Sequence, residues 1–194
     1  DFGLDDISFA TLSPFVTGPG VPGTDNQVVC AGVQIDSITY KVGSGASGPL
    51  VTGLPDGVIY TFDGLNLTIS GTPTTPGTYK YTIATTGSCP DPKADFGVIV
   101  VNPKASIRLT SPGKEIQSLC INANMDAVSY SIGGGGNGAT FTNLPPGISG
   151  SYFNGIATIS GSPSVAGVFN YQVITTGTCK QDTLGGILTI NGTP

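Results

Sequence analysis

Four cysteines are the residues of this sequence best suited to chemistry. They are Cys30, Cys89, Cys120 and Cys179, and the second pair follows the first at an offset of ninety residues. Cysteines in such a pattern form either disulfides or a metal site. Structural zinc requires four Cys or His ligands at close spacing, and this chain has no His and no CxxC motif. The cysteine pattern therefore favours a disulfide framework.

The cysteines begin and end two copies of one sequence pattern. Residues 30–89 and 120–179 match in register without a gap. A domain that was duplicated with both of its cysteines should close its own loop, which predicts the pairs Cys30–Cys89 and Cys120–Cys179. Each bond would close a loop of about sixty residues and stabilise its unit by about 3 to 4 kcal/mol. Such bonds imply an oxidising compartment.

Carboxylates are the other residues that could support a reaction or hold an ion. Asp5 and Asp6 are adjacent, and Asp91 and Asp95 lie after the first copy without counterparts in the second. Calcium requires six or more oxygen ligands, so we expect no cofactor and keep calcium as the alternative at these two places. Glycoside hydrolysis needs two carboxylates across a cleft, and the common nucleophilic triads need a His. The sequence therefore predicts no enzyme.

The composition indicates many short strands. The chain has 30 Gly and 15 Pro, only 10% of its residues are charged, and no segment shows a sustained helical apolar period. A net charge of −5 with scattered basic residues gives no footprint for nucleic acid. No segment is as long and apolar as a membrane-spanning helix, so we expect no direct membrane insertion. The fold class predicted is all-β.

The repeat period suggests how the chain is divided. A period of ninety residues is close to the roughly 100 residues of a small β-sandwich. We therefore expect one sandwich over residues 15–103 and a second over residues 104–194. Residues 1–14 form a strand-like run that ends at Pro14 and has no place in the repeat. They are interpreted as the last strand of an upstream domain or as a linker.

The repeat carries a recognisable series of short motifs. In the first copy they are LPxG, ISGTP, PGTYxYTI and TTGxC, at residues 54–57, 69–73, 76–83 and 85–89. This order resembles the Ig-like repeats of large bacterial cell-surface proteins, and the resemblance covers most of both copies. It is most similar to the SprB-type gliding-motility adhesins of Bacteroidota, which the type IX system exports. The resemblance implies two tandem Ig-like sandwiches at the cell surface, each with one intradomain disulfide.

The resemblance also implies a function. We expect a non-enzymatic stalk or spacer segment of a large adhesin, involved in gliding motility and surface adhesion. Its partners would be the neighbouring Ig-like repeats of the same chain and, through other domains, surface polysaccharide. Two alternatives remain: a glycan- or protein-binding module, and an accessory domain of a secreted enzyme.

Aromatic residues and glycine-rich segments are the candidates for ligand contact. The aromatic residues lie between the LPxG and ISG motifs and are Tyr60, Phe62, Tyr152 and Phe153. Exposed aromatic side chains there would favour a binding module, whereas their alternative role is to cover a sheet edge. The segments Gly43–Gly48 and Gly133–Gly136 are predicted to be mobile surface loops.

Two tripeptides are candidates for modification. Ser37 and Thr183 each follow an Asp and precede an apolar residue, which matches the O-glycosylation pattern of Bacteroidota that the resemblance implies. Strict alternation also puts Tyr79, Tyr81 and Ile83 on one face of a strand, where we expect them to pack in the core. We also expect Tyr40 and Tyr130 to substitute for the packing Trp of an Ig sandwich, because the chain has no Trp.

Overall fold

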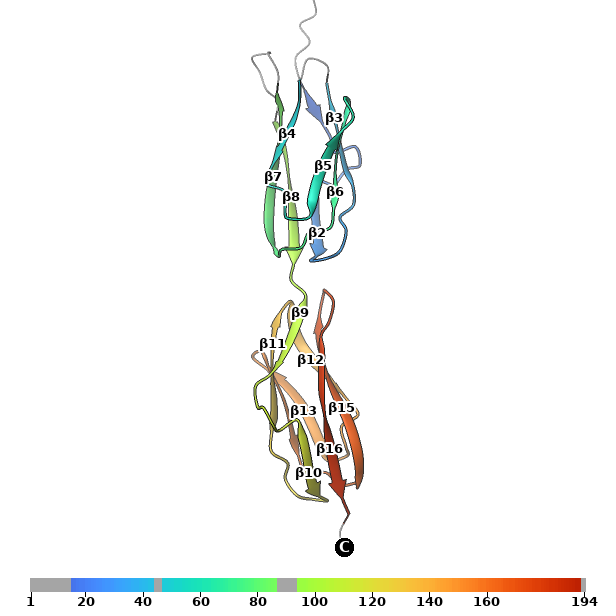
Figure 1. Cartoon of the computed structure of the whole chain (residues 1–194), viewed down its shortest axis with the longest axis vertical. Coiled ribbons are helices and arrows are strands. Elements are labelled where there is room, and N and C mark those ends of the chain that lie inside the picture. Colours follow the sequence, from blue (N-terminus) through green and yellow to red (C-terminus); the bar gives the residue numbers. More distant parts are fainter. Residues whose placement is uncertain (1–14, 44–46, 87–93, 193–194) are drawn as a thin grey trace, which may run out of the picture. The chain divides into compact units, whose positions relative to one another are not determined.

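The computed structural model describes residues 15–43, 47–86 and 94–192. Within these ranges every regular element is a strand, and no helix is present (Figure 1). The chain divides into two compact units, one ending at Val101 and the other beginning at Asn102. The division lies two residues before the predicted one. The strand expected within residues 1–14 falls outside the described ranges.

The first unit is built from eight described strands in two four-stranded sheets. One sheet has the order β1-β3-β6-β5 and the other β2-β8-β7-β4. The strands are β1 (Val16–Thr17), β2 (Asn26–Cys30), β3 (Ile38–Val42), β4 (Gly48–Thr52), β5 (Val58–Phe62), β6 (Asn66–Gly71), β7 (Gly77–Thr86) and β8 (Ala94–Asn102).

The second unit repeats this arrangement strand for strand. Its sheets have the orders β9-β11-β14-β13 and β10-β16-β15-β12. The strands are β9 (Ala105–Leu109), β10 (Ile116–Cys120), β11 (Val128–Gly134), β12 (Gly136–Thr142), β13 (Ile148–Phe153), β14 (Ile156–Gly161), β15 (Gly167–Gly177) and β16 (Thr183–Asn191). The sheets pair their strands antiparallel except for β10 and β16, which run parallel from Ile116↔Ile187 to Cys120↔Asn191.

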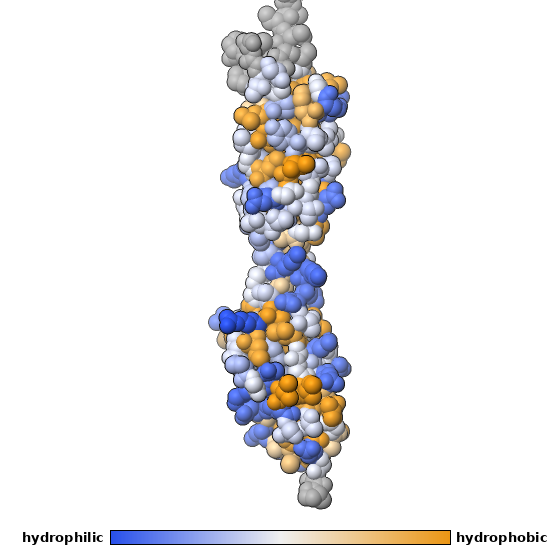
Figure 2. All heavy atoms as spheres, viewed as in Figure 1, coloured by the Kyte–Doolittle hydropathy of each residue, from blue (hydrophilic) through white to orange (hydrophobic). Residues whose placement is uncertain are grey.

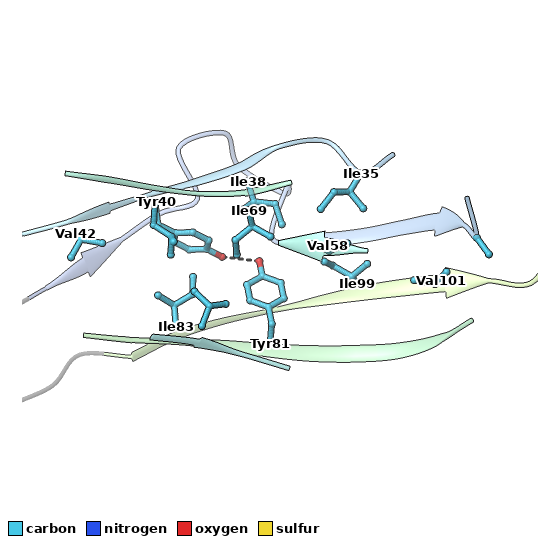
Figure 3. Close-up of a cluster of buried hydrophobic side chains, with 13 residues drawn as sticks. Ile35, Ile38, Tyr40, Val42, Val58, Ile69, Tyr81, Ile83, Ile99 and Val101 are labelled. Atoms are coloured by element: carbon cyan, nitrogen blue, oxygen red, sulfur yellow. Dashed lines mark hydrogen bonds between the residues drawn. The ribbon is translucent and has the colours of Figure 1, made fainter. Parts of the chain in front are cut away.

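Each unit has a core between its two sheets, and the alternation of the strands creates it. In β3, Ile38, Tyr40 and Val42 are buried while Lys41 is exposed. In β7, Tyr81 and Ile83 are fully buried, as predicted, and Tyr79 is partly buried and packs against the core. Side chains of successive residues point to opposite faces of a strand, so one face of each sheet is apolar and packs against the other sheet (Figure 3).

A pair of tyrosines joins the two sheets at the centre of each core. The hydroxyl groups of Tyr40 on β3 and Tyr81 on β7 are 2.9 Å apart and hydrogen-bonded (Figure 3). The hydroxyl groups of Tyr130 and Tyr171 form the same bond, also at 2.9 Å, in the second unit. All four side chains are at most 1% exposed. The tyrosine pairs thus fill the core position that was expected to replace the missing Trp.

The LPxG motif forms a tight turn before β5. Val58 N donates to Pro55 O at 3.0 Å, and Gly57 has a φ of 85°. A side chain at Gly57 would also overlap the carbonyl oxygen of Thr72, so both the conformation and the close approach require glycine. Leu54 packs against the core beside this turn.

The glycine run of the second unit is not the loop that the sequence predicted. Gly133 and Gly134 belong to β11 and pair with Ser106 and Ala105, and Gly136 begins β12. A Cβ at Gly134 would overlap the carbonyl oxygen of Lys104. The glycines therefore serve close backbone packing in a strand pair. In the first unit, residues 44–46 of the corresponding segment fall outside the described ranges.

Candidate functional site

The aromatic residues of β5 lie at the rim of the first sandwich. Tyr60 and Phe62 are opposite Ile69 and Leu67, both of which belong to the core. Because paired residues share a face, the two aromatic rings point to the inner face. They remain 39% and 37% exposed because β5 is the edge strand of its sheet. Tyr60 and Phe62 therefore cover the edge of the first sandwich.

The aromatic residues of β13 are divided between two faces. Tyr152, the repeat counterpart of Phe62, is partly buried and packs against the second core. Phe153 points to the outer face, is 84% exposed and pairs with Ile156, which is also exposed. The four predicted contact residues therefore do not form equivalent clusters in the two units. Apolar residues occur in separate patches on the face shown in Figure 2.

Each unit has a shallow groove that the sequence analysis missed. In the second unit it has a volume of about 510 Å³ and is lined by Glu115, Tyr171 and Gly185, with neighbouring residues of β15 and β16. In the first unit a groove of about 460 Å³ lies between the corresponding parts of β7 and β8. Both grooves lie beside a part of the sheet where the last strand, β16 or β8, has no strand paired on its outer side. Its partner there, β10 or β2, begins only further along. The sequence feature that could have indicated these grooves is the glycine in the last strand of each unit, Gly97 in β8 and Gly186 in β16.

These glycines make room for the tyrosine hydroxyl groups. Tyr171 Oη donates to Glu115 O at 3.3 Å, and Tyr81 Oη donates to Asp25 O at 3.4 Å. A Cβ at Gly186 or Gly97 would overlap both partners of the respective bond. The tyrosine hydroxyl group beside each groove is therefore hydrogen-bonded to the protein. Among the described residues, Glu115 Oε2 is the one buried side-chain oxygen or nitrogen without a hydrogen-bond partner.

Burial, not catalysis, explains the titration of the tyrosines. Removal from water raises the pKa of all four hydroxyl groups above the usual value of about 10. For Tyr81 and Tyr171 the hydrogen bond to the partner tyrosine raises the pKa further. A general base or acid would need a pKa near neutral pH. The tyrosines are unsuited to that role.

The raised pKa values predict a loss of stability in alkali. The unfolded chain releases tyrosine protons above about pH 10, where the folded chain keeps them, so the free energy of unfolding falls as the pH rises further. The expected slope is up to about 1.4 kcal/mol per pH unit for each tyrosine. Urea unfolding above about pH 9 would measure it. Replacing Tyr130 and Tyr171 by Phe should remove the effect from the second unit alone, and an unchanged slope there would contradict the account.

The cysteines depart from their predicted pairing. Cys30 and Cys179 are disulfide-bonded, but Cys120 is a free and exposed cysteine. The predicted Cys120–Cys179 bond is therefore wrong. Cys120 is level with Asn191 at the end of β16, whereas Cys179 precedes the start of β16 at Thr183. The nine residues of β16 span about 27 Å, so Cys120 and Cys179 lie beside opposite ends of this strand. A disulfide requires the two Cα atoms to lie within about 7 Å of each other.

The pairing predicted for the first unit involves a residue outside the described ranges, Cys89. The expectation that each unit holds one disulfide of its own is nevertheless wrong for the second unit, where Cys120 is free. The repeat correctly indicated a shared structural position for each cysteine. It could not indicate that the two positions lie at opposite ends of the sandwich.

Both predicted glycosylation residues are accessible. Ser37 is exposed and directly precedes β3. Thr183 is exposed at the first position of β16, and its N–H donates to Asp182 Oδ1 at 3.0 Å. Asp182 Oδ2 also accepts a hydrogen bond from Ile107 N at 3.2 Å. The acidic residue of this tripeptide thus has a structural role.

No candidate ion site forms in the described part of the chain. There, no group of three or more His, Cys, Asp or Glu side chains could hold a metal ion, and no helix could span a membrane. Asp5, Asp6 and Asp91 of the calcium alternative lie outside the described ranges. The ion pair between Lys114 Nζ and Asp126 Oδ2, at 2.7 Å, is exposed and contributes at most about 1 kcal/mol.

Comparisons with known proteins show the fold. No protein-family model and no curated protein matches the sequence. A three-Ig structure of titin domains I67–I69 with E-to-A mutations has a TM-score of 0.63 at 12% identity, and covers 94% of this chain and 67% of that chain. The I-band fragment I67–I69 from titin gives 0.59 at 11%, with 86% and 63% covered.

The insect immune protein hemolin gives a TM-score of 0.53 at 12% identity, with 97% of this chain and 49% of that chain covered. The chain thus spans about half to two thirds of the length of these structures. At such low identities the similarity concerns the fold alone. Together with the sheet orders and the two cores, it identifies the chain as a tandem of two Ig-like β-sandwiches.

Proposed function

We propose that the chain is a tension-bearing spacer segment of a large bacterial cell-surface adhesin, and that this protein takes part in gliding motility and surface adhesion. The motif resemblance supports the choice of protein class. In this role the segment has no catalytic residues and needs no cofactor. Its partners are the neighbouring Ig-like repeats of the same chain, and other domains of the protein contact surface polysaccharide.

The parallel pairing of β10 with β16 is the observation that carries this proposal. The second unit begins at the linker before β9 and ends with β16. Tension applied at its two ends first loads β9, which pairs with β11. Once β9 is detached, the tension pulls the start of β10 and the end of β16 in opposite directions along the strands. The ladder bonds between parallel strands are evenly spaced and bridge the strands across this direction. They must therefore break together, and not one after another as in a peeled hairpin.

A proline in β10 should weaken this mechanical resistance. Ile121 N donates to Asn191 O at 3.0 Å, so the N–H of Leu119, two residues earlier, also points toward β16. Leu119→Pro removes that donor. We expect the force needed to unfold the second unit of the reduced chain to fall several-fold in single-molecule stretching.

Leu119→Ala is the matched control because it removes the same side chain and keeps the N–H. Both variants should retain a cooperative thermal transition. If Leu119→Pro and Leu119→Ala unfold at the same force while both are folded, the β10–β16 pairing does not bear the tension, and the proposal loses its main support.

The exposed Phe153 is the feature that would favour a binding module. The other three aromatic candidates point to the inner face, so Phe153 has no aromatic neighbour among them on its own face. Single exposed apolar residues are common on protein surfaces. A second function is therefore not proposed. The exposed Ser37 and Thr183 fit the proposed surface location as sites of O-glycosylation.

A further inference from the structure

A polar groove, called the Asp36 groove below, lies beside β2 in the first unit. It has a volume of about 420 Å³, within the roughly 300 to 1,000 Å³ of ligand-binding clefts. The side chains that could contact a ligand there are Thr24, Asn26, Gln27, Val28, Gln34 and Asp36. Among the described residues that line the groove, Asp36 is the only charged one. The groove is therefore suited to a cationic group.

Both units build the same support around this carboxylate. In the first unit the side-chain amide of Gln27 donates to Asp36 O at 2.8 Å and accepts from Asp36 N at 2.9 Å. In the second unit Gln117 and Asp126 form the same two bonds, at 2.8 and 2.9 Å. Each pair holds the backbone of the aspartate and leaves the carboxylate available. The two carboxylates thus have equivalent positions in the two units.

The second unit holds a cation on this support. The same glutamine side chain fixes the turn before the strand, because Gln27 donates to Thr24 O at 2.8 Å and Gln117 donates to Lys114 O at 2.7 Å. From this turn the side chain of Lys114 reaches Asp126, and its Nζ lies 2.7 Å from Asp126 Oδ2. The chain itself therefore shows that a carboxylate at this position pairs with a lysine ammonium group.

The first unit has the carboxylate without the lysine. Thr24 stands where the second unit has Lys114, and its hydroxyl group donates to Val21 O at 2.8 Å. Among the described residues, no cation and no hydrogen-bond donor pairs with the carboxylate of Asp36. We propose that the Asp36 groove binds the ammonium group of a lysine side chain on a basic segment of another protein.

The groove fits a lysine better than a metal ion. Calcium needs six or more oxygen ligands, whereas the described lining offers a single carboxylate. Val28 is 70% exposed beside the groove, so it can contact the aliphatic stem of a lysine, and the second unit has Ser118 at this position. The net charge of −5 favours a basic partner. This site does not depend on the proposed spacer function.

Amide NMR spectra of the whole chain test the site with Nα-acetyl-lysine amide as the probe. The side-chain amide of Gln27 and the backbone amide of Asp36 should shift and saturate at millimolar probe concentrations. The amides of Gln117 and Asp126 should not shift, because Lys114 occupies their site. The same probe acetylated at Nε has no charge and should shift neither pair.

Asp36→Asn measures the contribution of the charge. The backbone of residue 36 keeps its bonds to Gln27, so the variant should fold as the wild type does. Its affinity for the probe should fall about fivefold, the upper end for an exposed ion pair. An unchanged affinity in this variant would overturn the proposal, as would equal shifts with the Nε-acetylated probe or the absence of a saturable shift in the wild-type chain.

An exchange of the two turn residues completes the test. Thr24→Lys places an ammonium group on the turn that carries Lys114 in the second unit, so it should pair with Asp36 and abolish probe binding there. Lys114→Thr should open the second site, so that the amides of Gln117 and Asp126 shift with the probe. Neither side chain is buried, so both variants should keep the thermal transition of the wild type.

These two variants also give the results that would contradict the account. Probe binding that survives Thr24→Lys would show that the probe does not occupy the Asp36 groove. A Lys114→Thr chain without shifts at Gln117 and Asp126 would show that the equivalent carboxylate accepts no external ammonium group. Either result would overturn the proposal, whereas the spacer function is tested by unfolding forces and would be unaffected.

Discussion

Replacing Tyr171 by Ala should lower the free energy of unfolding of the second unit by about 3 to 5 kcal/mol. The side chain is 1% exposed and lies between the two sheets, so its removal leaves a cavity in the middle of the core. It also removes the hydrogen bond to Tyr130. Urea unfolding followed by amide hydrogen exchange would measure the loss in each unit separately.

Tyr171→Phe separates the two contributions. It keeps the ring and leaves only the hydroxyl of Tyr130 unpaired, which should cost about 1 to 2 kcal/mol. Exchange protection in the first unit should not change in either variant because its core is separate. If the Ala and Phe variants were equally stable, the central position assigned to the ring would be wrong.

Gly186→Ala should destabilise the second unit by about 3 kcal/mol, through overpacking and loss of a hydrogen bond. The added Cβ would overlap both Glu115 O and Tyr171 Oη, so either the start of β10 or the tyrosine must move. Thermal unfolding would measure the change. Gly192→Ala is the control, because no atom lies within 4 Å of its added Cβ. A Gly186→Ala protein as stable as this control would contradict the close packing of this glycine.

The sequence predicted the fold from alternation and repetition. Strict alternation around Tyr81 and Ile83 was sufficient to place them in the core, because a half-buried strand leaves no other arrangement. The missing Trp led to Tyr40 and Tyr130 as replacements. Their hydroxyl partners were not predicted, because the side chains that meet across a sandwich depend on how the sheets stack.

The candidate site was harder to predict than the fold. The glycine run at residues 133–136 was interpreted as a loop because glycine lowers strand propensity, yet close backbone contacts require it there. The cysteine pairing failed for a related reason. Sequence spacing says which residues are equivalent, but not which end of a sandwich each one occupies. The grooves beside Gly97 and Gly186 depend on where β2 and β10 begin, which no local pattern indicated.

Pulling on one folded protein in two directions tests the spacer function most directly. Handles at the two chain ends load β10 against β16 in shear, whereas handles at Val168 and Asn191 peel β15 from β16, beginning at the open end of this pair at Gly167↔Ile190. Both Val168 and Asn191 are exposed, so handles there should leave the core intact. With the cysteines reduced, we predict a several-fold higher unfolding force for the second unit in the end-to-end direction. Equal forces in the two directions would contradict the proposal that this unit is built to bear tension.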